Sequence, residues 1–180
     1  LKMDVKPLTS WGLGSGPLII AGPCSAESEQ QVMDVALALK ATGMVRLFRS
    51  GIWKPRSRPG TFVGEGDKAL GWLARVREET GLPVAVEVAS PGHVEAALAH
   101  GTDVLWIGTR TVSNPFSVDE IARSLAGTDI PVMIKNPLSP DIELWMGAIE
   151  RFYAAGLTRL AGVLRGFTPY GRSAYRNIPK

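Results

Sequence analysis

The sequence predicts an α/β protein built as a parallel (β/α)8 barrel, or TIM barrel. This chain of 180 residues supplies about the first six strand–helix units, in one partial domain, 1–180. Three observations favour this fold: apolar, β-rich segments alternate with amphipathic ones, the apolar segments are continuous, and each unit takes about 30 residues. An open doubly wound sheet is the alternative. The lack of a GxGxxG motif after the first apolar segment counts against its dinucleotide-binding form.

The first strand is expected at residues 17–22, PLIIAG, a short apolar segment that ends in glycine. Residues 28–43 follow, with apolar side chains at helical spacing. Ser28 has the side chain of a helix N-cap, and Gly43 is typical of the position just past a helix end. Residues 44–48, MVRLF, are the second expected strand.

A loop rich in Lys and Arg leads to a second expected helix at residues 66–81, which Gly81 ends. Residues 83–88, PVAVEV, predict the third strand because valine favours extended backbone. Residues 91–101 predict a helix with Pro91 in its first turn, where a missing backbone N–H costs no hydrogen bond.

Two further strand–helix pairs and a sixth strand complete the pattern. The fourth pair is expected at residues 103–108, DVLWIG, and 117–127, and the fifth at 131–135, PVMIK, and 139–156. Residues 160–166, LAGVLRG, predict the sixth strand. Four large side chains of the last helix are expected in the core: Trp145, Met146, Phe152 and Tyr153.

The composition is that of a globular protein, with 45% hydrophobic and 21% charged residues. The net charge of +3 is small and the sequence has no long run of Lys and Arg, which counts against nucleic-acid binding. The apolar segments are too short to cross a membrane. The single cysteine allows no disulfide within the chain, which fits a reducing, cytoplasmic location.

Each expected strand ends at, or just before, a side chain that can bind a ligand or take part in a reaction. In chain order these are Cys24; Arg49, followed by Lys54 and Arg56; Glu87; Arg110; Lys135; and Arg165. Parallel strands direct these ends to one face, where the active sites of barrels lie. A single such arginine is most simply a salt-bridge partner. A series of cations that outnumbers the one carboxylate instead predicts a ligand with more than one phosphate or carboxylate group.

Cys24 has three interpretations. A lone cysteine is most often a small buried apolar residue. Beside cations at a strand end, it is also a candidate nucleophile with a lowered pKa, or a thiolate ligand of a metal. His93 and His100 lie on the third expected helix, away from the strand ends, and are interpreted as packing or surface residues. Further metal ligands would therefore come from sequence outside this chain.

Five motifs closely resemble those of 3-deoxy-D-arabino-heptulosonate 7-phosphate (DAHP) synthase. They are AGPCSAES (21–28), FRSGIWKPRSRPGTFVGEG (48–66), IGTRTVSNPF (107–116), MIKNP (133–137) and LRGFTPYG (164–171). The resemblance runs from about Pro17 to Lys180 and is greatest to the type I form without a long N-terminal regulatory extension. It implies a (β/α)8 barrel. It also implies the first reaction of the shikimate pathway to chorismate and the aromatic amino acids, in which phosphoenolpyruvate condenses with D-erythrose 4-phosphate and phosphate is released.

The resemblance implies binding roles for named residues. It makes Cys24 a ligand of a divalent metal, Mn²⁺, Fe²⁺ or Co²⁺, whose other ligands, a His, a Glu and an Asp, would lie beyond Lys180. Arg56 and Ser57 are implied to bind the phosphate of the aldose. The residues implied to surround phosphoenolpyruvate are Arg49, Lys54, Arg110, Lys135 and Arg165.

Cys24, Lys54 and Glu87 are the expected catalytic residues. The resemblance implies that the metal polarises the aldehyde oxygen, that Lys54 is the candidate acid for the new alkoxide, and that Glu87 positions the attacking water. Members of this family are commonly dimers or tetramers, so a homo-oligomer is expected. The native protein is expected to continue past Lys180, because six parallel strands leave two open edges.

Two other functions stay open. The related 3-deoxy-D-manno-octulosonate 8-phosphate synthase uses arabinose 5-phosphate as the acceptor, and the KPRS run at residues 54–57 argues against it. A non-catalytic, sugar-phosphate-binding fragment is the third interpretation, and loss of the missing metal ligands from the native protein would favour it.

Overall fold

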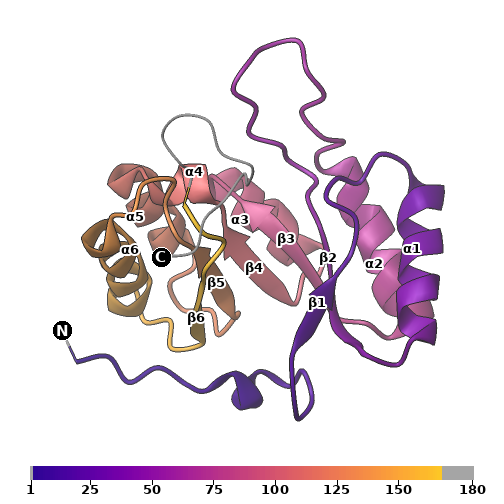
Figure 1. The fold of residues 1–180 in the computed structure, drawn as a ribbon, viewed down its shortest axis with the longest axis horizontal. Coiled ribbons are helices and arrows are strands. Elements are labelled where there is room, and N and C mark those ends of the chain that lie inside the picture. Colours follow the sequence, from indigo (N-terminus) through magenta and orange to yellow (C-terminus); the bar gives the residue numbers. More distant parts are fainter. Residues whose placement is uncertain (1, 168–180) are drawn as a thin grey trace.

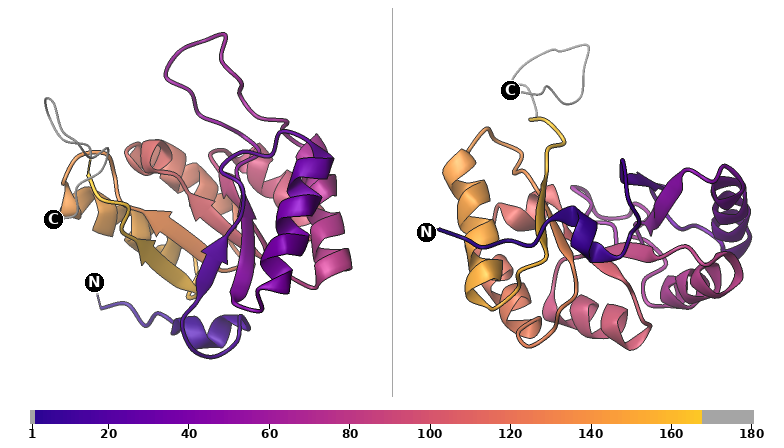
Figure 2. Two further views of the ribbon diagram at one scale, coloured as in Figure 1. Left: turned by 45° about the vertical axis from the view of Figure 1, so that its right-hand side comes forward. Right: turned by 90° about the horizontal axis from the view of Figure 1, so that it is seen from below.

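Six parallel strands form one sheet, in which each strand pairs with the next one along the chain (Figure 1). The computed structural model describes residues 2–167. The strands are β1 (Ile19–Ala21), β2 (Val45–Ser50), β3 (Val84–Val88), β4 (Val104–Ile107), β5 (Val132–Lys135) and β6 (Leu160–Val163). Figure 2 shows the sheet curling into part of a barrel, with the helices on its outer side. A doubly wound sheet reverses its strand order at a switch point, so the unbroken order and the curl confirm the predicted barrel.

The helices connect successive strands across the outer face of the sheet (Figure 1). They are α1 (Glu29–Ala41), α2 (Lys68–Thr80), α3 (Pro91–Ala99), α4 (Thr109–Val112), α5 (Pro115–Ser124) and α6 (Ile142–Ala154), with a 3₁₀ helix, η1 (Leu8–Trp11), before β1. The sequence did not predict η1 or α4. Each has four residues, which is too short to show a helical period.

The predicted helix ends are present. The Ser28 hydroxyl accepts a hydrogen bond from the backbone N–H of Gln31 at the start of α1, at 3.2 Å. Gly43 and Gly81, which follow α1 and α2, both have φ of +67°. Glycine adopts this left-handed conformation without a steric penalty, so the chain can leave the helix there.

Side chains are buried on both faces of the sheet, which explains the continuous apolar strands. On β2, Leu47 packs on the inner face with Trp106 and Met133, whereas its neighbour Phe48 joins the core beneath the helices. Both Leu47 and Phe48 are fully buried. Alternation along a strand sends neighbouring side chains to opposite faces, so the covered middle of β2 is apolar, whereas Arg46 is exposed and Arg49 is partly exposed.

The N-terminal segment crosses the barrel at the end opposite the carboxyl ends of the strands (Figure 1). Trp11 and Leu13 pack against the inner-face cluster. The backbone N–H of Lys6 donates to the carbonyl oxygen of Thr158 at 2.8 Å, next to β6. This segment therefore covers the lower end of the inner core and leaves the opposite mouth accessible.

One expectation for the last helix was wrong. Phe152 is fully buried, and Trp145 and Tyr153 are partly buried against the core, but Met146 is 38% exposed. Successive residues of a helix are about 100° apart around its axis, so Met146 points away from the face that Trp145 and Phe152 share.

Within the described part of the chain, β1 pairs only with β2 and β6 pairs only with β5, so the curled sheet has two unpaired edges. Across residues 2–167, no helix combines the length and the apolar character that a membrane crossing requires.

Candidate active site

Seven of the nine predicted site residues line one cavity at the carboxyl ends of the strands. This cavity, called the mouth cavity below, has a volume of about 280 Å³. Its lining residues are Cys24, Lys54, Pro55, Arg56, Glu87, Thr109, Arg110, Lys135, Leu138 and Arg165. Arg49 lines a deeper cavity of about 170 Å³ that shares Lys135 with the mouth cavity. Ser57 does not line either cavity, but its hydroxyl accepts a hydrogen bond from Arg110, which lines the mouth cavity.

Lys54 connects the ends of β1 and β2. Its Nζ donates to the carbonyl oxygen of Cys24 at 2.7 Å and lies 3.6 Å from Cys24 Sγ. Gly51 makes this approach possible, since a Cβ there would lie 2.7 Å from the Cys24 oxygen and 2.8 Å from Lys54 Nζ. The hydrogen bonds hold Lys54 against Cys24, and the absence of a side chain at Gly51 leaves the space for this contact.

Cys24 is exposed in the mouth cavity, so it is not the buried apolar residue that a lone cysteine most often is. Partial burial acts to raise the pKa of its thiol, but the charges and hydrogen bonds of Lys54 and Arg49 outweigh that effect and lower the pKa below its ordinary value. The guanidinium of Arg49 also donates to the carbonyl oxygen of Pro23 at 3.4 Å, which keeps it next to the thiol.

Arg110 connects the end of β4 to the loop after β2. Its Nη1 donates to the carbonyl oxygen of Pro55 at 2.7 Å, and its Nη2 donates to Ser57 Oγ at 3.0 Å. Within the loop, Arg56 Nε donates to the carbonyl oxygen of Phe62 at 2.8 Å. These bonds use part of each guanidinium, which has five N–H donors, and place both cations beside Ser57.

Trp106 lines the deeper cavity and contacts charged groups of both cavities. Its indole Nε1–H donates to Glu87 Oε2 at 2.9 Å. The Nζ of Lys135 lies 5.0 Å from its ring centroid and the Cζ of Arg49 lies 5.8 Å from it, which are cation–π distances. Gly108 leaves room for the carboxylate, because a Cβ there would lie 2.1 Å from Glu87 Oε1.

Lys135 is a partly buried cation of the mouth cavity. Burial lowers the pKa of its ammonium group, and the neighbouring Glu87 carboxylate opposes that effect. Three like charges lower the pKa further: Arg49, Lys54 and Arg165. Burial and mutual repulsion thus disfavour the charged form of Lys135, and a bound anion would offset both effects.

Asn136 holds the end of β5 against the residues that follow β6. It is fully buried. Its Nδ2 donates to the carbonyl oxygens of Pro137 and Gly166 at 2.8 and 3.0 Å, and its Oδ1 accepts from the backbone N–H of Arg165 at 2.7 Å. Lys135 and Arg165, on the two sides of this amide, both line the mouth cavity.

Sequence reasoning missed Trp106 and Asn136. The sequence pattern places Trp106 in an apolar strand, and its indole N–H among aliphatic side chains is the one signal of a polar role there. Asn136 lies in the motif MIKNP, but an uncharged side chain after a strand carries no local signal of a buried hydrogen-bonding role. The part of the motif LRGFTPYG after Phe167 lies outside the described residues.

Cys24 fits one position of the predicted metal site. Its thiol is accessible, and a lowered pKa favours the thiolate that divalent transition metals bind. Among residues 2–167, no three His, Cys, Asp or Glu residues gather closely enough to hold an ion. His93 stacks on Trp53 and His100 is exposed at the end of α3, so neither lines the mouth cavity, as expected.

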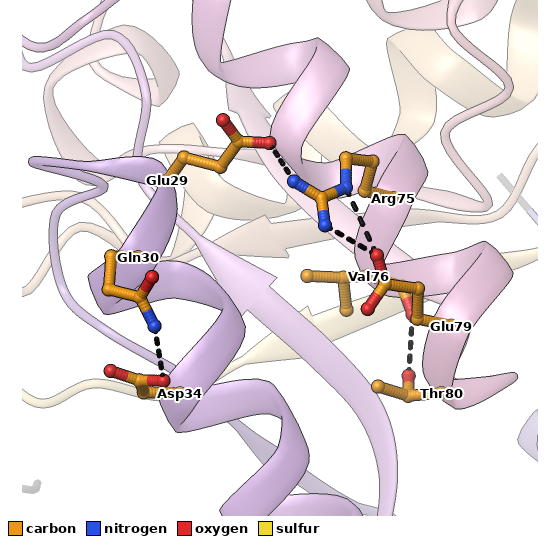
Figure 3. Close-up of polar contacts among 7 residues, drawn as sticks. All are labelled: Glu29, Gln30, Asp34, Arg75, Val76, Glu79 and Thr80. Carbon is orange, nitrogen blue, oxygen red and sulfur yellow. Dashed lines mark hydrogen bonds and ion pairs between the residues drawn. The ribbon is translucent and has the colours of Figure 1, made fainter.

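A larger cavity of about 480 Å³ lies between α1 and α2 and shares no lining residue with the mouth cavity. Arg75 bridges Glu29 on α1 and Glu79 on α2, and Gln30 donates to Asp34 at 2.7 Å (Figure 3). These groups pair with one another rather than gathering charge of one sign. The mouth cavity is therefore the candidate active site, despite its smaller volume.

Comparisons with known proteins agree with this fold. The model of the DAHP synthetase I family matches residues 3–176. The chain is 28% identical to a phospho-2-dehydro-3-deoxyheptonate aldolase of Thermotoga maritima, over 89% of this chain and 46% of that protein. It is 34% identical to a 2-dehydro-3-deoxyphosphooctonate aldolase of Nitratidesulfovibrio vulgaris (strain Hildenborough), over 93% of this chain and 63% of that protein.

The fold is also that of a solved structure. The crystal structure of a phospho-2-dehydro-3-deoxyheptonate aldolase (DAHP synthase) from Thermotoga maritima matches with a TM-score of 0.74 and 29% identity, covering 89% of this chain and 44% of that chain. The chain spans about half the length of these Thermotoga proteins. Because the family model covers nearly the whole sequence, the chain belongs to the DAHP synthetase I family.

Proposed function

We propose that this chain carries the phosphate- and carboxylate-binding part of a 3-deoxy-7-phosphoheptulonate synthase. The reaction joins phosphoenolpyruvate to D-erythrose 4-phosphate and gives 3-deoxy-D-arabino-heptulosonate 7-phosphate and phosphate. The observation that carries the proposal is the convergence of five cations around one carboxylate in the mouth cavity: Lys54, Arg56, Arg110, Lys135 and Arg165 around Glu87. Two phosphates and a carboxylate supply the negative charge that such a pocket requires.

The two substrates are assigned to two sides of the mouth cavity. Arg56 and Ser57, on the loop after β2, bind the phosphate of the aldose, with Arg110 beside them. The carboxylate and phosphate of phosphoenolpyruvate lie deeper, where the cations approach Trp106. The deeper set is Arg49, Lys54, Arg110, Lys135 and Arg165. Lys54 and Arg110 lie between the two substrates and screen their mutual repulsion.

The reaction forms one C–C bond and one C–O bond, the latter from water, and breaks the C–O bond to phosphate. C3 of phosphoenolpyruvate attacks the aldehyde carbon, and its π electrons form the new bond while the carbonyl oxygen becomes an alkoxide. Lys54 donates a proton to that alkoxide. Water adds to the positive C2, with Glu87 positioning it and the carboxylate itself held by Trp106. The hemiketal phosphate then expels phosphate and leaves the ketone.

A divalent metal, Mn²⁺, Fe²⁺ or Co²⁺, would be held by the Cys24 thiolate and by ligands outside the described residues, and would polarise the aldehyde oxygen. The Lys54 ammonium contributes in two ways here. It favours the thiolate form of Cys24, and it stands where the new alkoxide forms. The functional protein is proposed to be a homo-oligomer, a dimer or a tetramer.

A second candidate is the octulosonate synthase reaction, in which arabinose 5-phosphate replaces erythrose 4-phosphate. The match to the Nitratidesulfovibrio 2-dehydro-3-deoxyphosphooctonate aldolase favours it. The two acceptors differ by one carbon, so the distance from the aldehyde to the phosphate site at Arg56 and Ser57 decides between them. The loop after β2 sets that distance.

The test is a phosphate-release assay on the complete gene product with phosphoenolpyruvate and each aldose phosphate in turn. Higher kcat/KM with erythrose 4-phosphate supports the proposal. Higher kcat/KM with arabinose 5-phosphate supports the second candidate. Binding of phosphoenolpyruvate without turnover of either aldose would contradict both and leave a sugar-phosphate-binding protein.

A further inference from the structure

A parallel ring stack links α3 to the loop that carries the substrate-binding cations. The rings of Trp53 and His93 have centroids 4.0 Å apart and an interplanar angle of 2°. Trp53 directly precedes Lys54, but neither ring lines the mouth cavity. The stack therefore lies behind the site, on the side of the helices.

His93 is fixed in this position by hydrogen bonds at the start of α3. Its Nδ1 accepts from the backbone N–H of Ala89 at 3.2 Å, and its own backbone N–H donates to Ser90 Oγ at 3.3 Å. An Nδ1 that accepts a hydrogen bond carries no proton, so the ring is neutral and protonated only at Nε2. Ala89 follows the end of β3 by one residue, and Glu87 lies two residues before it.

Trp53 is fixed in turn on its other side. Its indole Nε1–H donates to Asp67 Oδ1 at 3.2 Å, where the loop reaches α2. The backbone N–H of Lys54 donates to the carbonyl oxygen of Val63 at 2.7 Å, and that of Gly66 donates to the carbonyl oxygen of Ile52 at 3.0 Å. The two ends of the loop are thus tied together next to the stack.

A glycine makes it possible to close the base of this loop, which residues 52–54 and 63–66 form and which is called the neck below. A Cβ at Gly64 would lie 1.9 Å from the carbonyl oxygen of Ile52, and the φ of Gly64 is +98°. The two backbone segments of the neck are therefore in direct contact at Ile52 and Gly64.

We infer that His93 is a positioning residue: by stacking on Trp53 and accepting from Ala89, it fixes the loop that carries Lys54 relative to the end of β3 that carries Glu87. This inference rests on the proposed function, in which Lys54 and Glu87 act on the same reaction. Neither ring needs to touch a substrate. A shift of the neck moves Lys54 away from Cys24 and from Glu87 together.

The protonation state of His93 matters to this device. Burial lowers the pKa of its imidazole, and the two facing carboxylates, Asp67 and Glu87, oppose that effect without reversing it. The ring therefore stays neutral at neutral pH. In acid, a proton on Nδ1 removes the acceptor from Ala89 and loosens the link between loop and strand.

Two substitutions separate the two contacts of the ring. His93→Phe keeps an aromatic ring for Trp53 and removes the acceptor. His93→Asn keeps an acceptor at the place of Nδ1 and removes the ring. His100→Asn is the matched control, since His100 is exposed at the end of the same helix. All are made in the complete gene product, so that the barrel and any metal site are intact.

Hydrogen exchange of residues 52–66 and steady-state kinetics give independent measurements. Both His93 variants should exchange these amides roughly threefold to tenfold faster, the effect of losing one aromatic contact or one hydrogen bond. Their kcat/KM should fall by about tenfold to 10²-fold, as for a slightly misplaced catalytic group. In the wild-type protein and in His100→Asn, kcat/KM should fall as the pH is lowered. His93→Asn has no titrating ring at this position, so it should lack this fall.

Unchanged loop exchange and unchanged kcat/KM in both His93 variants would overturn the inference. If the His93 variants have a lower melting temperature but the same fall of kcat/KM in acid as the wild type, His93 has a purely structural role. This result would overturn the inference as well. If the wild-type protein catalyses neither condensation, the proposed function fails, and loop exchange alone then decides whether His93 holds the loop.

Discussion

Lys54 lies against Cys24, with its Nζ 2.7 Å from the Cys24 carbonyl oxygen and 3.6 Å from the sulfur. One ammonium group therefore stabilises the turn after β1, favours ionisation of the thiol and stands in the mouth cavity. The chain reaches this arrangement because β1 and β2 are adjacent and parallel and because Gly51 has no side chain to block the contact.

The titration of Cys24 tests this contact. Because Lys54 and Arg49 lower the pKa of the thiol, alkylation of Cys24 by iodoacetamide should have its inflection below the ordinary value of 9.0. Lys54→Met removes a charge and a hydrogen bond that lower the pKa of the thiol, whereas burial still raises that pKa. The inflection should therefore move to higher pH. The rate is followed by mass spectrometry of the peptide that contains Cys24. Equal inflections in the wild type and the variant would show that Lys54 does not act on the thiol.

Turnover tests the proposed acid. Lys54→Met should lower kcat by about 10²-fold or more, the low end for loss of general acid catalysis. Lys40→Met is the control, since Lys40 is exposed in the last turn of α1. Steady-state assay of the complete protein measures both. Near-normal turnover in Lys54→Met would remove Lys54 from the mechanism.

The position of the Glu87 carboxylate depends on Gly108. Gly108→Ala places a Cβ 2.1 Å from Glu87 Oε1, so the carboxylate must move, which disturbs the hydrogen bond from Trp106 to Oε2. We expect kcat to fall by about 10²-fold, as for a misplaced group, with the fold intact. Gly71→Ala is the matched control: its Cβ meets nothing within 4 Å inside α2, and it should add about 0.5–1 kcal/mol of stability. Equal kcat in the two variants would contradict this account of Glu87.

The buried amide of Asn136 is predicted to support both fold and binding. Asn136→Leu leaves the backbone N–H of Arg165 and the carbonyl oxygen of Gly166 without this partner, so the free energy of unfolding should fall by about 1–3 kcal/mol. The KM for phosphoenolpyruvate should rise, because Lys135 and Arg165 lose their common support. Urea denaturation and kinetics measure the two effects. Asn136→Asp keeps an acceptor for Arg165 but buries a carboxylate that cannot donate to the carbonyl oxygens of Pro137 and Gly166, so it should lose stability as well. Unchanged stability in both variants would contradict the role of this amide.

Local features of the sequence predicted most of the fold. The six strands were predicted because their apolar segments are continuous, and the start of α1 because Ser28 has an N-capping side chain. Gly43 and Gly81 marked helix ends for the same local reason. The four-residue elements η1 and α4 were missed, since one helical turn shows no period, and Met146 was wrongly placed in the core because residue type outweighed its position on the helix.

The candidate site was predictable in membership but not in geometry. Parallel strands send their ends to one mouth, so the gathering of Cys24, Glu87 and the cations follows from topology. The bonds of Arg110 to Pro55 and Ser57 join residues more than 50 positions apart and need the tertiary structure. Trp106 and Asn136 were missed because their roles come from neighbours on other strands, which no local pattern reveals.

The most direct test of the central claim is a crystal structure of the complete protein with phosphoenolpyruvate. The account predicts that its phosphate and carboxylate oxygens lie about 2.7–3.2 Å from side-chain nitrogens of Lys135, Arg110 and Arg165, above Trp106. Phosphoenolpyruvate bound elsewhere, for example between α1 and α2, with the mouth cavity empty at saturating ligand, would contradict it.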